Sequence, residues 1–192
     1  MQIEKVATLL GFRLAACLAL SAMLVPAFPA AAISPVGVEL GSGTDPYGNA
    51  VARVVRSISQ YTRWSDESQP LRFCVIGPAD HAGQISDFGL SRGRTMLVRR
   101  LRADAAFAEQ CDAIYIGRMA IAEQREVVDA VRGREILTIT ENDPACRSRA
   151  MFCLLFQAES LSFRLNIDSV SRSGLRVDPR VLRLAASSGE GS

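Results

Sequence analysis

The residues of this chain best able to do chemistry are its cysteines and a single histidine. Cys74, Cys111, Cys146 and Cys153 lie in the body of the chain, and Cys17 lies near its start. Four such thiols could bind zinc, but none of them forms a Cys-x-x-Cys pair. Because the start of the chain also has the pattern of an export signal, the cysteines favour two disulfides in an oxidising compartment.

The histidine, His81, lies just beyond a predicted strand, where parallel α/β proteins bind ligands. A Ser–His–Asp or metal site would need partners that the sequence does not supply, so a surface or capping histidine is expected. The glycines of 89–93 match no phosphate-binding motif and indicate a turn. We therefore expect no catalytic residue, no metal and no cofactor. An exported hydrolase lacks a nucleophile–base pair.

Residues 1–32 have the pattern of a cleavable secretory signal peptide. Lys5 and Arg13 precede the apolar run 14–25, and Ala30 to Ala32 supply the small residues that a signal peptidase requires. The apolar run is well short of the roughly 20 residues that span a bilayer, although an uncleaved anchor is the alternative. We expect cleavage after Ala32 and a periplasmic location.

The charge of the remaining chain argues against nucleic-acid binding. Without Lys5, Arg13 and Glu4 the chain has 20 basic and 19 acidic residues, so it is nearly neutral. Its densest basic cluster is Arg99-Arg100-Leu101-Arg102. Nucleic-acid-binding domains carry a much larger excess of basic residues, so no nucleic-acid partner is expected.

The pattern of apolar residues predicts an α/β fold in one domain, residues 49–186. Residues 33–48 are rich in Gly, Ser, Pro and Thr and indicate a flexible arm, and 187–192 indicate a disordered tail. Helical spacing runs from Asp45-Pro46 to Trp64. Predicted strands 71–76, 95–98, 111–117 and 135–140 then alternate with predicted helices 80–88, 103–110 and 120–132. This alternation is typical of a mostly parallel sheet flanked by helices.

The last third of the chain departs from this alternation. Strands 151–156 and 161–167 are joined by a short link and predict a C-terminal antiparallel hairpin. In the second strand Leu161, Phe163, Leu165 and Ile167 alternate with polar residues, so one face is polar. Short helices are expected at 168–172 and 179–184.

The positions of the cysteines also suggest how they pair. Cys146 and Cys153 flank a segment short enough to turn back, and Cys74 and Cys111 fall in strands that neighbour each other in many doubly wound sheets. Neighbouring strands bring Cα atoms to the roughly 5.5 Å that a disulfide needs. From loop-closure entropy, we expect the disulfide that closes the longer loop to stabilise the folded state by about 3 to 4 kcal/mol, and the one that closes the shorter loop by less. The long-loop bridge should be structural, and the short one is the better candidate for a labile or regulatory bond.

Several segments carry a likeness to a known family by their order and spacing. They are Val55-Arg-Ser-Ile-Ser-Gln-Tyr-Thr-Arg-Trp64, Leu71-Arg-Phe-Cys-Val-Ile-Gly77, Gln110-Cys-Asp-Ala-Ile-Tyr-Ile116, Gly133-Arg-Glu-Ile-Leu-Thr-Ile-Thr140, Leu161-Ser-Phe-Arg-Leu-Asn-Ile-Asp168, Ser173-Gly-Leu-Arg-Val177 and Leu182-Arg-Leu-Ala185. Together, over roughly residues 50–186, they resemble the YfiR family of periplasmic regulators. All four cysteines match that family's two disulfides, which pair Cys74 with Cys111 and Cys146 with Cys153.

The resemblance implies a binding protein rather than an enzyme. YfiR-like proteins are periplasmic α/β proteins that tend to form homodimers. They repress an inner-membrane diguanylate cyclase by binding its periplasmic sensor region, and loss of repression raises cyclic di-GMP and favours biofilm. An OmpA-like outer-membrane lipoprotein can sequester the repressor, and thiol state can change its activity.

The resemblance places the partner-binding surface in the C-terminal part of the chain. The matching residues are Phe152, Phe163, Arg164, Leu165 and Ile167. For each apolar member of this set, packing in the core is the alternative role. Arg164 stands where the family commonly has an acidic residue, so a cognate cyclase would need a matching change. Ser65 replaces the proline that usually follows the tryptophan.

A second hypothesis comes from a different class of protein. A periplasmic small-molecule binding protein could use the loops near His81 and Arg92 to Arg94. Melting that responds to a ligand in the absence of any cyclase partner would favour this hypothesis.

Overall fold

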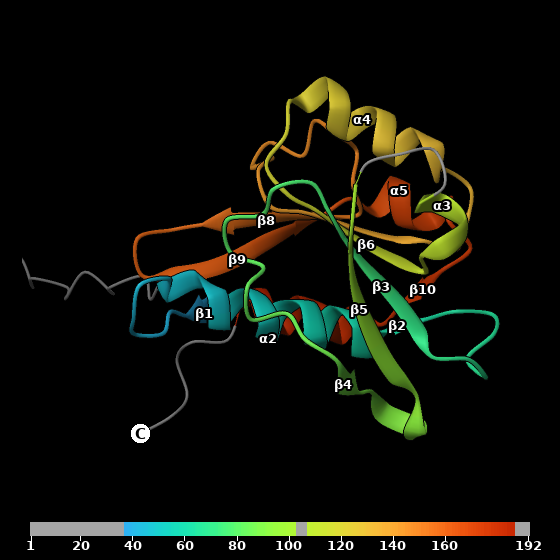
Figure 1. Cartoon of the computed structure of the whole chain (residues 1–192), viewed down its shortest axis with the longest axis horizontal. Coiled ribbons are helices and arrows are strands. Elements are labelled where there is room, and N and C mark those ends of the chain that lie inside the picture. Colours follow the sequence, from blue (N-terminus) through green and yellow to red (C-terminus); the bar gives the residue numbers. More distant parts are fainter. Residues whose placement is uncertain (1–36, 103–106, 187–192) are drawn as a thin grey trace, which may run out of the picture. The chain divides into compact units, whose positions relative to one another are not determined.

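The computed structural model describes residues 37–102 and 107–186 and has an α/β fold built on one large sheet (Figure 1). Its strands are β1 (Val38–Glu39), β2 (Thr62–Arg63), β3 (Leu71–Ile76), β4 (Phe88–Gly89), β5 (Thr95–Leu101), β6 (Ala113–Ile116), β7 (Leu137–Thr140), β8 (Phe152–Phe156), β9 (Ser160–Leu165) and β10 (Arg176–Val177). The large sheet has the order β1-β9-β8-β7-β6-β3-β5-β4, and β2 pairs with β10 separately.

The predicted fold class is confirmed. Strands β5, β3, β6, β7 and β8 run parallel to one another, as the alternation of strands and helices predicts. Strands β8 and β9 form the predicted antiparallel hairpin. Strands β1 and β4 add antiparallel partners at the two edges.

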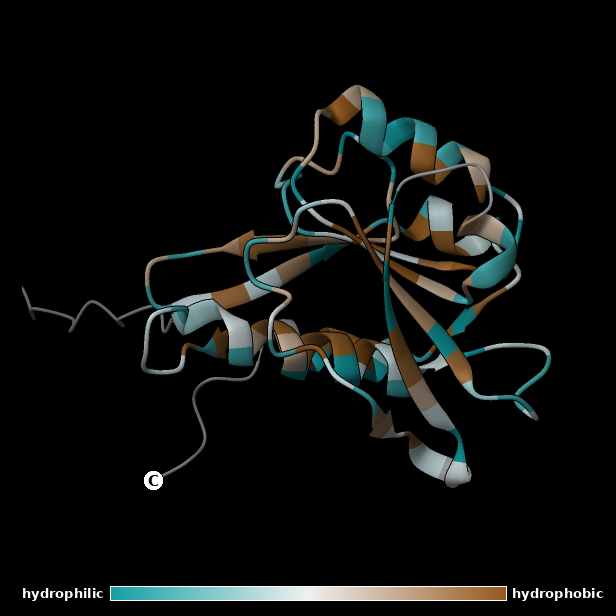
Figure 2. Ribbon diagram, viewed as in Figure 1, coloured by the Kyte–Doolittle hydropathy of each residue, from teal (hydrophilic) through white to brown (hydrophobic). Residues whose placement is uncertain are grey.

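Helices cover both faces of the sheet. They are α2 (Pro46–Tyr61), α3 (Phe107–Gln110), α4 (Ile121–Ala130), α5 (Ile167–Ser171) and α6 (Arg183–Ala186), with 3-10 helices η1 (Ser91–Gly93) and η2 (Pro179–Leu182). In β3, Phe73 and Val75 pack in a cluster with α2, whereas Cys74 and Ile76 pack in a second cluster with α3 and α4. Figure 1 accordingly shows α2 and α4 on opposite sides of the sheet. Hydrophobic residues concentrate in the strands between them (Figure 2).

Helix α2 begins where its capping residues predict. The side chain of Asp45 accepts hydrogen bonds from the backbone N–H groups of Tyr47 and Gly48, both at 3.1 Å, and Pro46 occupies the first turn. The helix ends at Tyr61 rather than at Trp64, because Thr62 and Arg63 form β2 and pair with β10. The pairing requires an extended backbone at Thr62 and Arg63, so the helix stops before Trp64.

The helix predicted over 80–88 is wrong. These residues form a loop followed by the two-residue strand β4. The N–H groups of Asp80 and His81 donate to the side chain of Glu141 at 3.2 and 2.7 Å. At the other end, Asp87 accepts a hydrogen bond from the Val98 N–H of β5 at 2.7 Å. Bonds to distant residues thus hold this segment in a loop.

The predicted arm contains a strand that the sequence analysis did not include. Val38 pairs with Leu161 and Glu39 with Ser160 at the edge of β9. The predicted signal peptide, residues 33–36 of the arm and the predicted tail lie outside the described residues. Within 37–102 and 107–186, no helix has the length and apolar character needed to cross a membrane.

Candidate functional site

The five residues predicted to contact a partner gather at the open end of the β8–β9 hairpin. Phe152 of β8 lies opposite Leu165 of β9, and Arg164 lies opposite Cys153. Phe163 pairs one step further into the hairpin, and Ile167 begins α5 directly after it. The hairpin therefore brings residues from two strands and a helix together.

Burial divides these five residues into two groups. The rings of Phe152 and Phe163 meet edge to face at 5.4 Å between centroids and belong to the core beneath the sheet. Core packing, the alternative role, is what the structure gives these two residues. Arg164 is exposed, Leu165 is half-buried, and the Ile167 side chain is 74% exposed. The exposed surface that the five residues offer is therefore made by Arg164, Leu165 and Ile167 at the end of the hairpin, with Arg164 and Leu165 pointing to opposite faces of β9.

The loop closed by the shorter disulfide lies against this surface. The Arg149 carbonyl accepts a hydrogen bond from the Ser169 hydroxyl of α5 at 2.8 Å, and the Met151 carbonyl accepts one from the Asn166 N–H at 2.8 Å. Asn166 also caps α5 by accepting from the Ser169 N–H at 3.1 Å. A change in the loop would therefore reach the first turn of α5, where Ile167 lies.

The structure pairs the cysteines as the sequence analysis expects. Cys74 and Cys111 are joined with their Cα atoms 5.9 Å apart, and both lie in the core between the sheet and α4. Cys146 and Cys153 are joined at 5.5 Å. Cys146 is the only one of the four that is partly exposed. The shorter bridge is thus the one that a reductant can reach.

The short loop is also held in an unusual backbone conformation. Cys146 has φ of 55° and Arg149 has φ of 67°, in the left-handed region that costs non-glycine residues energy. The two side-chain oxygens of Asp143 oppose this cost by accepting hydrogen bonds from the N–H groups of Arg147 and Ser148 at 2.9 and 2.6 Å. The disulfide and the buried Asp143 together hold this conformation.

His81 is partly buried and contacts the residue that caps α2, without capping the helix itself. Its Nδ1 lies 2.8 Å from Oδ1 of Asp45, the carboxylate that caps α2. Its ring also packs against those of Tyr47 and Phe156, with centroids 5.0 and 4.9 Å away. The histidine thus joins the start of α2 to the loop after β3 and to the hairpin.

Sequence reasoning missed the buried carboxylate beneath this histidine. Glu141 directly follows β7 and is 4% exposed. Burial raises its pKa, opposed by the hydrogen bond from the His81 N–H. Burial also raises the pKa of Tyr115 well above its usual value, and the charge of Glu141 adds to this. The available signal was an acidic residue next to the carboxyl end of a buried strand.

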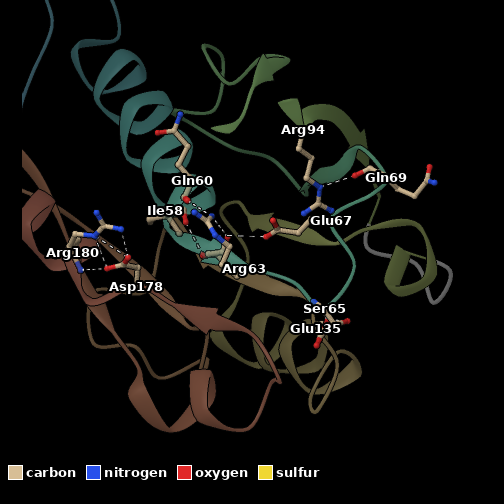
Figure 3. Close-up of polar contacts among 11 residues, drawn as sticks. Ile58, Gln60, Arg63, Ser65, Glu67, Gln69, Arg94, Glu135, Asp178 and Arg180 are labelled. Atoms are coloured by element: carbon tan, nitrogen blue, oxygen red, sulfur yellow. Dashed lines mark hydrogen bonds and ion pairs between the residues drawn. The ribbon is translucent and has the colours of Figure 1, made fainter. Parts of the chain in front are cut away.

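A groove of about 610 Å³ opens at the amino ends of the strands. It is lined by Arg63, Trp64, Ser65, Glu67, Glu135, Gly174 and Arg176. Figure 3 shows Ser65 beside Glu135, to which it donates from its hydroxyl at 2.7 Å and from its N–H at 2.9 Å. These hydrogen bonds lower the pKa of Glu135 below its ordinary value, and the bond from the Ser65 hydroxyl has the larger effect. A proline at position 65 could supply neither hydrogen.

The structure does not place the loops near His81 and near Arg92 to Arg94, on which the small-molecule hypothesis depends, next to each other. His81 follows the carboxyl end of β3, whereas Arg94 precedes β5 and donates to the Gln69 carbonyl at the amino end of β3, at 2.7 Å. Arg94 also stacks over Trp64, 5.0 Å from the ring centroid. Arg94 therefore lies near the groove around Trp64 and away from His81.

No metal centre forms within the described part of the chain. Residues 37–102 and 107–186 contain no group of three or more His, Cys, Asp or Glu side chains placed to hold an ion.

The chain matches the model of a known protein family. A family model described as YfiR/HmsC-like matches residues 49–186. The matched region runs from α2 to α6 and includes both disulfides and the hairpin.

The two disulfides should differ in their contribution to stability. Replacing Cys74 and Cys111 by serine should lower the free energy of unfolding by about 4 kcal/mol from loop entropy alone, against about 2.5 kcal/mol for the shorter loop. The first pair leaves two serine hydroxyls in the core, whereas the second leaves one, at position 153. Urea unfolding of both double variants would measure the difference, and equal losses would contradict it.

Controlled reduction tests the same difference between the two disulfides. Because Cys146 is partly exposed and the other three are buried, limited reductant followed by alkylation and mass spectrometry should label Cys146 and Cys153 first. Labelling of Cys74 and Cys111 at the same rate would count against it.

Glu141 should make the protein less stable as the pH rises. Its pKa is raised in the folded state, so the buried charge costs nothing below the unfolded pKa, and the cost develops as pH rises through the raised value. Relative to Glu141→Gln, the wild type should lose free energy of unfolding as the pH rises above about 4, the unfolded pKa of a glutamate.

Glu135→Gln is the matched control with the opposite sign. The pKa of Glu135 is lowered, so the wild type should gain stability relative to this variant as the pH rises from the lowered value to the unfolded pKa, that is, below about pH 5. Urea unfolding at several pH values checks both variants. A pH-independent difference for Glu141→Gln would show that its carboxylate is not penalised by burial.

Proposed function

The chain belongs to the YfiR/HmsC-like family, and on that basis we propose that it is a periplasmic negative regulator of a membrane-bound diguanylate cyclase. In this proposal the protein binds the periplasmic sensor region of the cyclase and lowers the output of cyclic di-GMP. It acts by binding and not as an enzyme. The family match over residues 49–186 is the observation that carries the proposal.

The exposed end of the hairpin is the surface we assign to the cyclase. Two large apolar side chains of the described residues are exposed, Ile167 at 74% and Leu182 at 47%. Ile167 stands next to a rigid, fully paired hairpin and beside a half-buried leucine, Leu165. Apolar anchors on a rigid support are typical of the residues that dominate binding energy.

Arg164 would set the specificity of this contact. Its side chain is exposed and forms no ion pair with any residue that the structure describes. A cation at this position favours a partner with a carboxylate opposite it, whereas the family's usual acidic residue favours a basic partner. We therefore propose that the cognate cyclase is acidic at this contact.

The shorter disulfide would make binding sensitive to redox state. Reduction of Cys146–Cys153 removes one of the restraints on the left-handed conformations of Cys146 and Arg149. Arg149 and Met151 hold α5 and Asn166 through their carbonyls. Relaxation of the loop would thus move Ile167, and binding would change while the core remained folded.

The same proposal includes two further partners, which are expected from the family. They are a second copy of the chain, giving a homodimer, and an OmpA-like outer-membrane lipoprotein. If the lipoprotein binds at Arg164, Leu165 and Ile167, it and the cyclase would compete, and sequestration would release the cyclase.

Deletion of the gene should raise cyclic di-GMP. The nucleotide would be measured by mass spectrometry in the deletion strain, in the complemented strain and in a strain that also lacks the candidate cyclase. Complementation should restore the wild-type level, and loss of the cyclase should abolish the rise. An unchanged level with the cyclase present and expressed would refute the repressor function.

Single substitutions test the surface. Ile167→Asp should weaken binding to the purified sensor region by about 30-fold, the loss expected when a hot-spot residue worth about 2 kcal/mol is removed. Leu182→Asp is the matched control, since it places the same charge on the other exposed apolar side chain. Titration calorimetry measures both, and equal losses would remove the hairpin from the interface.

The groove around Trp64 supports a second candidate function, the binding of a small molecule. Its volume of about 610 Å³ suits a ligand of metabolite size, and its wall combines an indole with arginine and glutamate side chains. A compound that raises the melting temperature of the purified protein, but not that of a Trp64→Ala variant, would favour this function.

A further inference from the structure

The outer edge of β5 is largely unpaired within the described residues. Strand β3 pairs with β5 along its whole length on one side, from Met96 to Leu101. On the other side β4 pairs only with Thr95 and Met96. Beyond them, Asp87 accepts from the Val98 N–H, and no strand among residues 37–102 and 107–186 covers Leu97 to Leu101. Such an edge can accept a further strand.

Arginines line this edge on both faces of the sheet. Arg99 lies in register with Cys74, and Arg100 lies in register with Val75. Because Cys74 and Val75 point to opposite faces of the sheet, Arg99 and Arg100 do so too. Arg102 follows the strand with the same alternation as Arg100. All three are exposed, and none forms an ion pair with a described residue. This is the densest basic cluster of the sequence, and the hairpin surface leaves it unused.

A pocket adjoins the edge at the carboxyl ends of β3 and β5. It has a volume of about 300 Å³ and includes Gly77, Ala79, Ala82, Gly83 and Arg100 in its wall. Arg100 also donates to the Ala82 carbonyl at 3.1 Å, which places its guanidinium at the rim. Small residues around one cation leave room for a side chain that arrives along the edge.

We propose that the edge of β5 binds an extended acidic segment of a partner protein as an added β-strand. Main-chain hydrogen bonds to the free edge would supply affinity, and the arginines and the pocket would select the sequence. Because Arg99 and Arg100 point to opposite faces, the segment should carry carboxylates at consecutive positions. The partner strand would lie at the opposite end of the sheet from the hairpin, so the inference is independent of the proposed function.

The arrangement disfavours the other occupants of such an edge. A second copy that paired through β5 in antiparallel fashion would bring arginines opposite arginines, and like charges across strands are destabilising. An anionic membrane surface is flat, whereas these arginines project from both faces of a strand and cannot all meet one plane. An acidic strand fits both the charge and the shape.

The test uses the protein purified from the periplasm and a fluorescein-labelled synthetic peptide of about eight residues, valines interspersed with glutamate pairs. Fluorescence anisotropy should show binding, with affinity at least about tenfold weaker when glutamine replaces glutamate. N-methylation of the amides on one edge of the peptide should weaken binding by a similar factor. Hydrogen exchange should show new protection of the Arg100 and Arg102 amides on peptide binding.

Charge reversal on the protein gives the matched comparison. Arg99→Glu with Arg102→Glu should weaken binding at least about tenfold, whereas Arg134→Glu with Arg183→Glu, the same charge change at exposed positions outside β5, should not. Circular dichroism melts would establish that both variants are folded. Three outcomes would overturn the proposal: no peptide binding, binding that is insensitive to N-methylation, or arginine-dependent binding to phosphatidylglycerol vesicles without peptide binding.

Discussion

Parallel strands that are apolar on both faces must be covered on both faces, and the central strands of this sheet impose that constraint on the rest of the molecule. Every residue of β6 and β7 is buried. Helix α2 covers one face, α3 and α4 cover the other, and the Cys74–Cys111 bridge lies within the second layer. Both faces of the central sheet are therefore covered by helices, which leaves its edges and the ends of its strands for binding.

This constraint also explains how much of the fold the sequence predicts. Strands buried on both faces appear as continuous apolar runs, so β3, β6 and β7 are visible in the sequence, as are α2 and the hairpin. The two-residue strands β1, β2, β4 and β10 carry no such pattern, since pairing with distant residues creates them. The loop before β4 is held by Glu141 and Val98, about which local sequence says nothing.

The candidate surface was predicted only in part for a related reason. Alternation along β9 correctly separates Phe163 from Arg164, because neighbouring side chains point to opposite faces. Alternation gives direction but not exposure. Phe152 and Phe163 are buried because another layer covers their face, whereas Ile167 lies past the last strand residue and beyond that layer. Deciding exposure requires knowing what packs above each face.

Under the two proposals, the hairpin surface and β5 are far enough apart for two partners to bind at once. Four strands, β8, β7, β6 and β3, separate β9 from β5, which at about 4.8 Å between neighbours places these two strands about 24 Å apart. An extended strand on β5 would therefore not obstruct the hairpin. The Cys74–Cys111 bridge lies in the core between them, while the Cys146–Cys153 loop contacts α5 through the Arg149 carbonyl and α4 through the Arg147 carbonyl, which accepts from Arg125 at 2.8 Å. Under these proposals, reduction of Cys146–Cys153 acts on the hairpin through α5, while the buried Cys74–Cys111 bridge keeps β3, the strand that pairs with β5, in place.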